Sequence, residues 1–229
     1  MANASTPSVV RVWDLPTRVF HWLLAVTVLG SLTTAWLDAM VWHIRCGLTV
    51  MALLLFRIVW GLVGGRWSRF TSFVYGPPTV LRYLRGQIRE GDHFEVGHNP
   101  LGSFSVFGML GFLAVQVATG LVADDEISVQ GPLNRYVANA KALAATSWHK
   151  DFGQWILLTL VVLHVAAIVY YLVRKKNNLV RPMLSGDKPM PADSPTIPAS
   201  SDSLATRGLA LAVGAFCAAV AIWVGRLGS

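Results

Sequence analysis

Residues 148–173 read WHKDFGQWILLTLVVLHVAAIVYYLV, and this stretch decides the class of fold. From Phe152 to Val173 it carries no Asp, Glu, Lys or Arg, and about 20 such residues suffice to cross a lipid bilayer. A basic run, residues 174–176, ends it. The stretch therefore predicts a membrane-spanning helix with His149 at its beginning and His164 within it.

Four more apolar runs bring the expected number of spans to five. They cover about residues 19–37, 41–63, 101–122 and 209–224, and the last one is short and rich in alanine. A short polar break at Asp38 separates the first two, which predicts an antiparallel hairpin. Asn99 and Pro100 suit the N-cap and the first position of the third helix.

The composition agrees with a membrane protein. Of the 229 residues 54% are hydrophobic and 14% are charged, with a mean hydropathy of +0.51, whereas a soluble domain carries about 25% charged residues. These values exclude a simple soluble enzyme and a disordered chain, and the runs exceed the strands of about 10 residues in a β-barrel. Because no CxxC or CxxCH motif occurs, we expect neither a zinc ribbon nor a covalently attached haem.

We expect three parts along the chain: a membrane domain over residues 1–188, a polar linker with little to pack over 189–206, and an additional C-terminal helix over 207–229. A short helix is expected near residues 133–144. The net charge of +7 comes from Lys and Arg between the apolar runs, so it indicates topology and not nucleic-acid binding. By the positive-inside rule the N-terminus, without a recognisable signal peptide, is expected in the cytoplasm.

Four of the six histidines, namely His21, His43, His149 and His164, lie in or at the ends of spans. Ionisable groups at membrane depth are functional candidates, although a single one also serves as an interhelical hydrogen bonder. His149 and His164 are fifteen residues apart, which places them roughly 22 Å apart along a helix and on broadly the same side. Matching depths then pair His43 with His149 and His21 with His164.

Each pair offers two imidazoles to one metal. A bare zinc ion needs more ligands than two, whereas a haem iron needs two axial ligands because the porphyrin supplies four. Helix bundles commonly hold such groups between facing helices. Small residues that make room for the rings, or merely allow close helix packing, are Gly30, Ser31, Gly47, Gly108 and Gly111.

Several short motifs follow one another in a characteristic order. They are VWDLPTRVFHW (12–22), FRIVWGLVG (56–64), GHNPLG (97–102), TGLVADD (119–125), GPL (131–133), HVAAIVYY (164–171) and NLVRPMLSG (178–186). Over about residues 9–188 the chain thereby resembles the bacterial cytochrome b561-type family, which includes b-type cytochrome subunits of membrane hydrogenases. The resemblance implies an all-α four-helix bundle in the bacterial inner membrane with two non-covalent b haems. It carries the axial-ligand role onto His21, His43, His149 and His164.

Other residues are candidates for contacts with the haem propionates. Arg57 lies inside the second span, where it either pairs a propionate or extends to the membrane surface. Arg18 and Arg45 are candidates because they lie near His21 and His43. His98 either belongs to the start of a helix or exchanges protons at a quinone site, and His93 is given no role. The fifth span lies outside the resemblance and is expected to be an extra anchor or a contact for a partner.

The leading functional hypothesis is transmembrane electron transfer in a respiratory chain, between quinone or quinol and a periplasmic redox partner such as a c-type cytochrome. The acidic residues 124–126 would steer a basic partner. One alternative is a superoxide:quinone oxidoreductase acting at the outer haem, in which case the chain is itself an enzyme. Another is a cytochrome or anchor subunit of a larger complex such as a hydrogenase.

Overall fold

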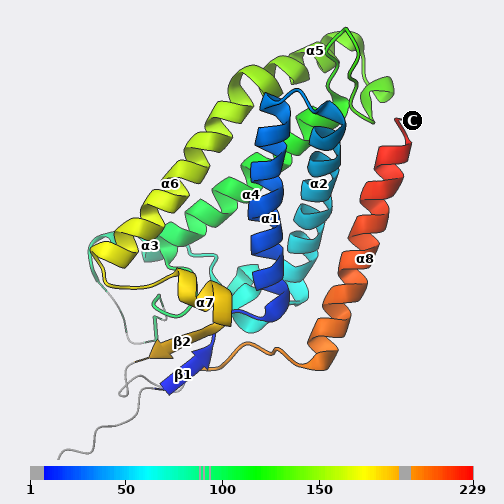
Figure 1. Cartoon of the computed structure of the whole chain (residues 1–229). Coiled ribbons are helices and arrows are strands. Elements are labelled where there is room, and N and C mark those ends of the chain that lie inside the picture. The colour runs from blue at the N-terminus through cyan, green and yellow to red at the C-terminus, as the bar shows by residue number, and fades with distance from the viewer. Residues whose placement is uncertain (1–7, 88, 90, 93, 191–196, 229) are drawn as a thin grey trace, which may run out of the picture. The chain divides into compact units, whose positions relative to one another are not determined.

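The computed structural model describes residues 8–87, 89, 91–92, 94–190 and 197–228. His93 and linker residues 191–196 lie outside this range. Five helical stretches in the described part are long and apolar enough to cross a membrane, which confirms the five predicted spans and a multi-pass membrane protein. They contain α1 (Leu15–Trp36), α2 (Met40–Val63), α4 (Pro100–Val122), α6 (Gln154–Val173) and α8 (Leu204–Arg226) (Figure 1).

The fourth span is longer than expected. Helix α5 (Asn139–Ser147) runs through a π-helical segment, Trp148–Gly153, directly into α6, so that 139–173 is one helical stretch. The helix predicted near residues 133–144 begins late, because Asn134–Tyr136 forms only a 3-10 turn. No glycine or proline lies between Asn139 and Phe152 to end α5 before the span.

The basic stretch between the second and third spans contains unpredicted structure. Two 3-10 turns, Arg66–Ser68 and Phe70–Ser72, precede the short helix α3 (Pro77–Leu84). The two prolines of α3 occupy its first turn, where a missing backbone N–H costs nothing. Gly76-Pro77-Pro78 is therefore a local signal for the start of a helix.

The residue contacts divide the chain into two units. Unit 1 comprises Met1–Val19, Val59–Val106 and Ala166–Ala210, and unit 2 comprises Phe20–Ile58, Phe107–Val165 and Leu211–Ser229.

Unit 2 has a core to which four helices contribute. Its buried side chains are Val28 and Leu32 of α1, Val50 and Leu54 of α2, Leu113 of α4 and Leu157 of α6. Helix α8 also packs in this unit, because a Cβ at Gly225 would lie 2.8 Å from Leu48 of α2. Many other apolar side chains are exposed, as expected where lipid replaces water.

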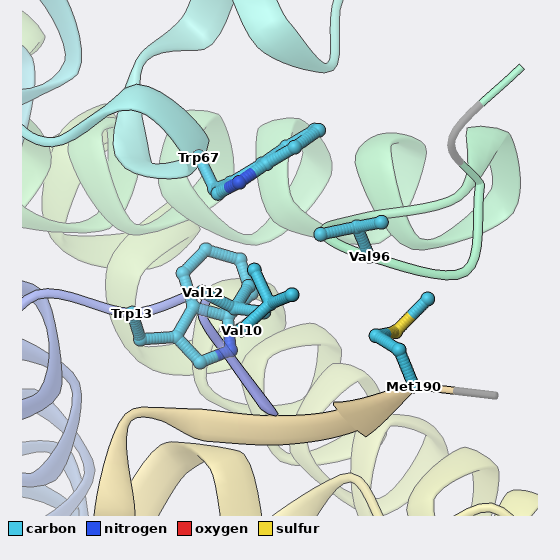
Figure 2. Close-up of a cluster of buried hydrophobic side chains, with 6 residues drawn as sticks. All are labelled: Val10, Val12, Trp13, Trp67, Val96 and Met190. Carbon is cyan, nitrogen blue, oxygen red and sulfur yellow. The ribbon is translucent and has the colours of Figure 1, made fainter. Parts of the chain in front are cut away.

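Unit 1 contains a small β-sheet that was not predicted. Strands β1 (Ser8–Arg11) and β2 (Asp187–Met190) pair antiparallel, and each has only four residues, which is too short for a recognisable alternation. Figure 2 shows the cluster beside it, formed by Val10, Val12, Trp13, Trp67, Val96 and Met190.

Residues 197–206 of the predicted linker pack within unit 1. Ser200 is buried; its Oγ donates a hydrogen bond to Val12 O at 2.7 Å and accepts one from Trp67 N at 3.2 Å. The indole N–H of Trp67 donates to Pro198 O. The expectation of little packing therefore does not hold for this part, and α8 already begins at Leu204.

Asp14, within the VWDLP motif, is fully buried and N-caps α1. Its Oδ1 accepts a hydrogen bond from Thr17 N at 2.8 Å. The carboxylate also accepts hydrogen bonds from the Trp60 indole (3.2 Å), Gly65 N (2.9 Å) and the Ser68 hydroxyl (3.0 Å). One carboxylate thus ties the start of α1 to the end of α2 and the turn that follows.

A second buried carboxylate, Asp202, lies just before α8. It accepts hydrogen bonds from Arg11 at 2.7 Å and Arg207 at 3.0 Å. Arg18 lies 3.9 Å away and also donates to Leu184 O. These ion pairs join β1 and the starts of α1 and α8 within unit 1.

Candidate functional site

The four membrane histidines lie in two pairs within unit 2. The ring centres of His43 and His149 are 5.9 Å apart, and their planes are inclined by 81°. Those of His21 and His164 are 6.4 Å apart and inclined by 49°. Each pair joins two helices, because His43 belongs to α2, His149 to the π-helical segment, His21 to α1 and His164 to α6.

The ring nitrogens of His43 and His149 have defined roles. Nδ1 of His43 lies 2.9 Å from Ser31 O, and Nδ1 of His149 lies 2.9 Å from Gln116 O. A carbonyl oxygen can only accept, so Nδ1 carries the proton in both rings. Nε2 of each ring is then left with its lone pair. This arrangement is typical of metal-ligating histidines, whose second nitrogen donates to a carbonyl.

The His21/His164 pair has a different environment. Nδ1 of His21 is buried and has no hydrogen-bond partner among the described residues. Its ring meets the Trp22 ring edge-on, with centres 5.1 Å apart. Nothing in the described part of the chain therefore fixes the tautomer of His21 as the carbonyls fix those of His43 and His149.

Helix α4 carries no histidine but positions His149. Besides the carbonyl of Gln116, the Thr119 hydroxyl lies 3.3 Å from Nδ1 of His149. A Cβ at Gly120 would lie 2.8 Å from Cε1 of this ring, so only glycine leaves it room. None of the three was predicted as a site residue from the sequence, although Gln116 is the one amide side chain in this helix.

A cavity of about 690 Å³ lies beside the His43/His149 pair. Apolar residues from α1, α2, α4 and α6 line most of it, with Gly47 and Gly120 in its wall. Charged residues, among them Asp38, Asp125 and Lys150, also line it. The volume falls within the range of about 300–1,000 Å³ that is typical of small-molecule and cofactor sites. Of the glycines suggested from sequence, Gly108 and Gly111 are exposed, and an added Cβ at either would meet no atom within 4 Å.

These residues fit an iron held by a macrocycle. Imidazole nitrogens bind metals at about 2 Å, and each ring centre lies about 1 Å behind its nitrogen, so two rings on opposite sides of one metal have centres about 6 Å apart. Both pairs match this spacing. The described residues contain no cluster of three or more His, Cys, Asp or Glu that would hold a bare ion. Two axial histidines suffice for a haem.

The three candidate arginines lie in different surroundings. Arg57 is buried in α2, and Arg45 is exposed with its guanidinium 4.8 Å above the Trp42 ring. Arg18 contacts Asp202 and Leu184 O within unit 1. A role toward a propionate remains an expectation for all three.

His98 belongs to unit 1. Its ring lies between Trp13 and Phe73, with centres 4.8 and 4.7 Å away, and its carbonyl accepts a hydrogen bond from the Tyr75 hydroxyl. In the same unit, Asn99 accepts a hydrogen bond from Gly102 N, which makes it the N-cap of α4 as predicted.

Burial is the main cause that raises the pKa of Tyr83 to about 12, and a hydrogen bond with Tyr171 adds to it, so this phenol stays neutral.

The acidic residues 124–126 organise their own loop. Asp124 O accepts a hydrogen bond from the Thr146 hydroxyl, and Asp125 Oδ1 accepts from the backbone of Ile127, Ser128 and Val129. These three backbone hydrogen bonds lower the pKa of Asp125, which is partly exposed. The predicted role of this cluster in steering a partner has no further support from these contacts.

Comparison with known proteins gives a family and several relatives. The family described as prokaryotic cytochrome b561 matches residues 12–186. A probable Ni/Fe-hydrogenase B-type cytochrome subunit of Bradyrhizobium diazoefficiens is 26% identical over 214 residues, covering 78% of this chain and 85% of the relative.

Two similar relatives carry closely related names. The probable Ni/Fe-hydrogenase 1 B-type cytochrome subunit of Escherichia coli K12 is 23% identical over 212 residues (76% and 88% covered). The probable Ni/Fe-hydrogenase B-type cytochrome subunit of Rhodobacter capsulatus is 25% identical over 219 residues (78% of this chain and 81% of the relative covered). No solved structure matches the chain. Because the family match spans most of the chain and includes both histidine pairs, this protein belongs to the prokaryotic cytochrome b561 family.

Proposed function

We propose that this protein is a di-haem cytochrome that carries electrons across the bacterial inner membrane between a redox partner subunit and quinone. Membership of the cytochrome b561 family makes b-type haem its cofactor. The observation that carries the proposal of two haems is the arrangement of His21/His164 and His43/His149 at ring-centre distances of 6.4 and 5.9 Å.

The spacing of the pairs supports a transmembrane path. His149 and His164 lie on one helical stretch, fifteen residues apart, which corresponds to roughly 22 Å of helix. This distance covers most of the hydrocarbon core of a membrane, which is about 30 Å thick. Two haems at these depths would therefore serve the two faces of the membrane.

The names of the relatives favour a partner subunit. The relatives are probable Ni/Fe-hydrogenase B-type cytochrome subunits, so a hydrogenase or similar redox enzyme is the partner that we propose. We prefer it to the c-type cytochrome expected from sequence. The Lys and Arg distribution supports an N-terminus in the cytoplasm, which puts the His43/His149 pair toward the periplasm.

The chain's own residues would hold the cofactors and exclude water. A b haem supplies reversible one-electron chemistry at its iron. His43 and His149 would bind one iron through Nε2, with their protons held on Nδ1 by Ser31 O and Gln116 O. Most of the cavity lining is apolar, and burial of a haem among apolar residues is one way in which a protein sets the reduction potential.

A haem count on the purified protein tests the number of haems. Pyridine haemochrome should give two b haems per chain, and His43→Ala and His164→Ala should each lose about one. His98→Gln is the matched control, because it removes a histidine outside the pairs and should keep two. One haem in the wild type would overturn the relay, and none would overturn haem binding altogether.

The partner is tested with the wild-type membrane fraction. Hydrogen should reduce the haems when a hydrogenase co-purifies in mild detergent, and added quinone should reoxidise them. Reduction by superoxide or by a reduced c-type cytochrome, with none by hydrogen, would replace the proposed partner by one of these donors. If electrons still flow from hydrogen to quinone at the wild-type rate in His43→Ala, the chain serves only as an anchor for the partner subunit.

A further inference from the structure

Gln116 of α4 contacts His149 at two places. Its backbone carbonyl lies 2.9 Å from Nδ1 of the imidazole, and its side-chain Nε2 donates to the backbone carbonyl of His149 at 2.8 Å. The residue is only 8% exposed. A single residue of a helix without histidine thus holds both the ring and the main chain of a candidate ligand.

The main chain at His149 requires this support because it lies in a π-helical segment. In this segment Gln154 N donates to His149 O, five residues back, in place of the four-residue bond of an α-helix. The extra residue rotates the following side chains by about 100° relative to the α-helix before it. Helix geometry alone therefore leaves the direction of His149 less defined than that of His164 in α6.

Two glycines make room for these contacts between Gln116 and His149. A Cβ at Gly153 would collide with Oε1 of Gln116, and a Cβ at Gly120 would lie 2.8 Å from Cε1 of His149. Gly153 thus allows the amide to reach His149 O, and Gly120 allows the ring to reach Gln116 O. His43 lies in the α-helix α2, and both contacts of its Nδ1, the carbonyl at 2.9 Å and the hydroxyl at 3.2 Å, come from Ser31.

We infer that Gln116 is a positioning residue, which fixes the tautomer and direction of His149 so that its Nε2 faces the iron shared with His43. This inference rests on the proposed haem at that pair. Gln116 touches the ligand and not the iron, so it acts on the bond between His149 and the metal. Its loss should change one haem site and leave the His21/His164 site unaltered.

The test compares Gln116→Leu and Gln116→Glu with the wild-type holoprotein. Leu removes the amide at similar volume, and Glu keeps the shape but cannot donate to His149 O when ionised. The matched control is Thr159→Val, because the Thr159 hydroxyl donates to Trp155 O at 2.8 Å on α6 and Thr159 is not one of the residues that line the cavity. Haem content, an optical redox titration and the low-spin EPR signals are measured on each protein.

We expect Gln116→Leu to weaken haem binding at one site by about 10- to 100-fold, the usual effect of losing an outer partner of a metal ligand. Leu keeps the backbone carbonyl that accepts from Nδ1, so the midpoint potential of that haem should rise only as far as the released main chain of His149 lets its ring move away from this carbonyl. Its EPR signal should shift while the other stays in place. Thr159→Val should match the wild type in all three measurements.

Each other outcome has a separate meaning. Wild-type spectra and potentials in Gln116→Leu would overturn the positioning role while two haems still support the proposed function. Equal loss of both haems in Gln116→Leu and Gln116→Glu would also overturn it, because a merely structural role predicts that result. Fewer than two haems in the wild type would instead overturn the proposed function.

Discussion

Substitution of Gly120 by alanine should displace the His149 ring. The new Cβ would lie 2.8 Å from Cε1, whereas ordinary contacts begin at 3.4 Å, so the ring must move by about 0.6 Å. Gln116 and Gly120 are one turn apart on the same face of α4. A ring pushed away from Gly120 therefore also leaves the Gln116 carbonyl, and the bond of 2.9 Å lengthens to about 3.5 Å, the limit of a hydrogen bond.

The expected result is selective loss of one haem. We expect overpacking to cost about 1–3 kcal/mol of stability and haem affinity at the His43/His149 site to fall by about 10- to 100-fold. The haem at the His21/His164 site should stay. Pyridine haemochrome gives the count, and a redox titration identifies which component disappears.

The control for this substitution lies on the same helix. Gly111→Ala adds the same methyl group to α4 at an exposed position where no atom lies within 4 Å of the added Cβ, so it should keep two haems. Two full haems with unchanged potentials in Gly120→Ala would show that His149 does not depend on the close approach of α4, and the reasoning would be wrong.

Three further predictions concern potential and stability. The haem at His43/His149 should have the lower midpoint potential, because both of its ligands donate a hydrogen bond from Nδ1. Each such bond is worth about 1 kcal/mol, or roughly 40 mV, so the difference should be tens of millivolts. His43→Ala should remove the component of lower potential and leave the higher one. Asp14→Ala should lower the free energy of unfolding by about 2–4 kcal/mol in detergent denaturation, because it leaves buried donors unpaired; an unchanged midpoint would contradict this. Burial alone would raise the pKa of Asp202, but hydrogen bonds from Arg207 and its other partners outweigh this and hold that pKa below its usual range. Its stabilisation is therefore present above about pH 4 and lost as the pH falls, so denaturation midpoints of wild type and Asp202→Asn should differ at pH 7 and converge below pH 4.

The sequence was sufficient for the features that depend on hydrophobicity and local signals. Five apolar runs predicted five spans, and Asn99 followed by Pro100 predicted the start of α4. The ordered motifs around Asp14 and the histidines indicated the cytochrome b561 family, to which the chain belongs. These signals are local, so they survive without knowledge of the tertiary structure.

Contacts between distant segments could not be predicted in this way. Pairing of β1 with β2 joins residues near 10 and 188, and Ser200 reaches back to Val12. The four-residue strands and a polar serine carry no signal that would distinguish them from a solvated connection. In particular, this part of the polar linker packs because Ser200 bonds to the backbone of Val12 and Trp67, and because Pro198 O accepts from the Trp67 indole.

The same limit applies to the outer partners of the histidines. Ser31 and Gln116 hold Nδ1 of His43 and His149 through backbone carbonyls, and every residue type has such a carbonyl. Sequence can therefore suggest an imidazole ligand, but the acceptor that fixes its tautomer becomes visible only once the helices are packed. Gln116 and Gly120 are exceptions, because an amide and a glycine on one face of α4 are side-chain signals. A pair of this kind, one turn apart on a helix that lacks a histidine, is a pattern by which positioning helices can be sought in other members of the cytochrome b561 family.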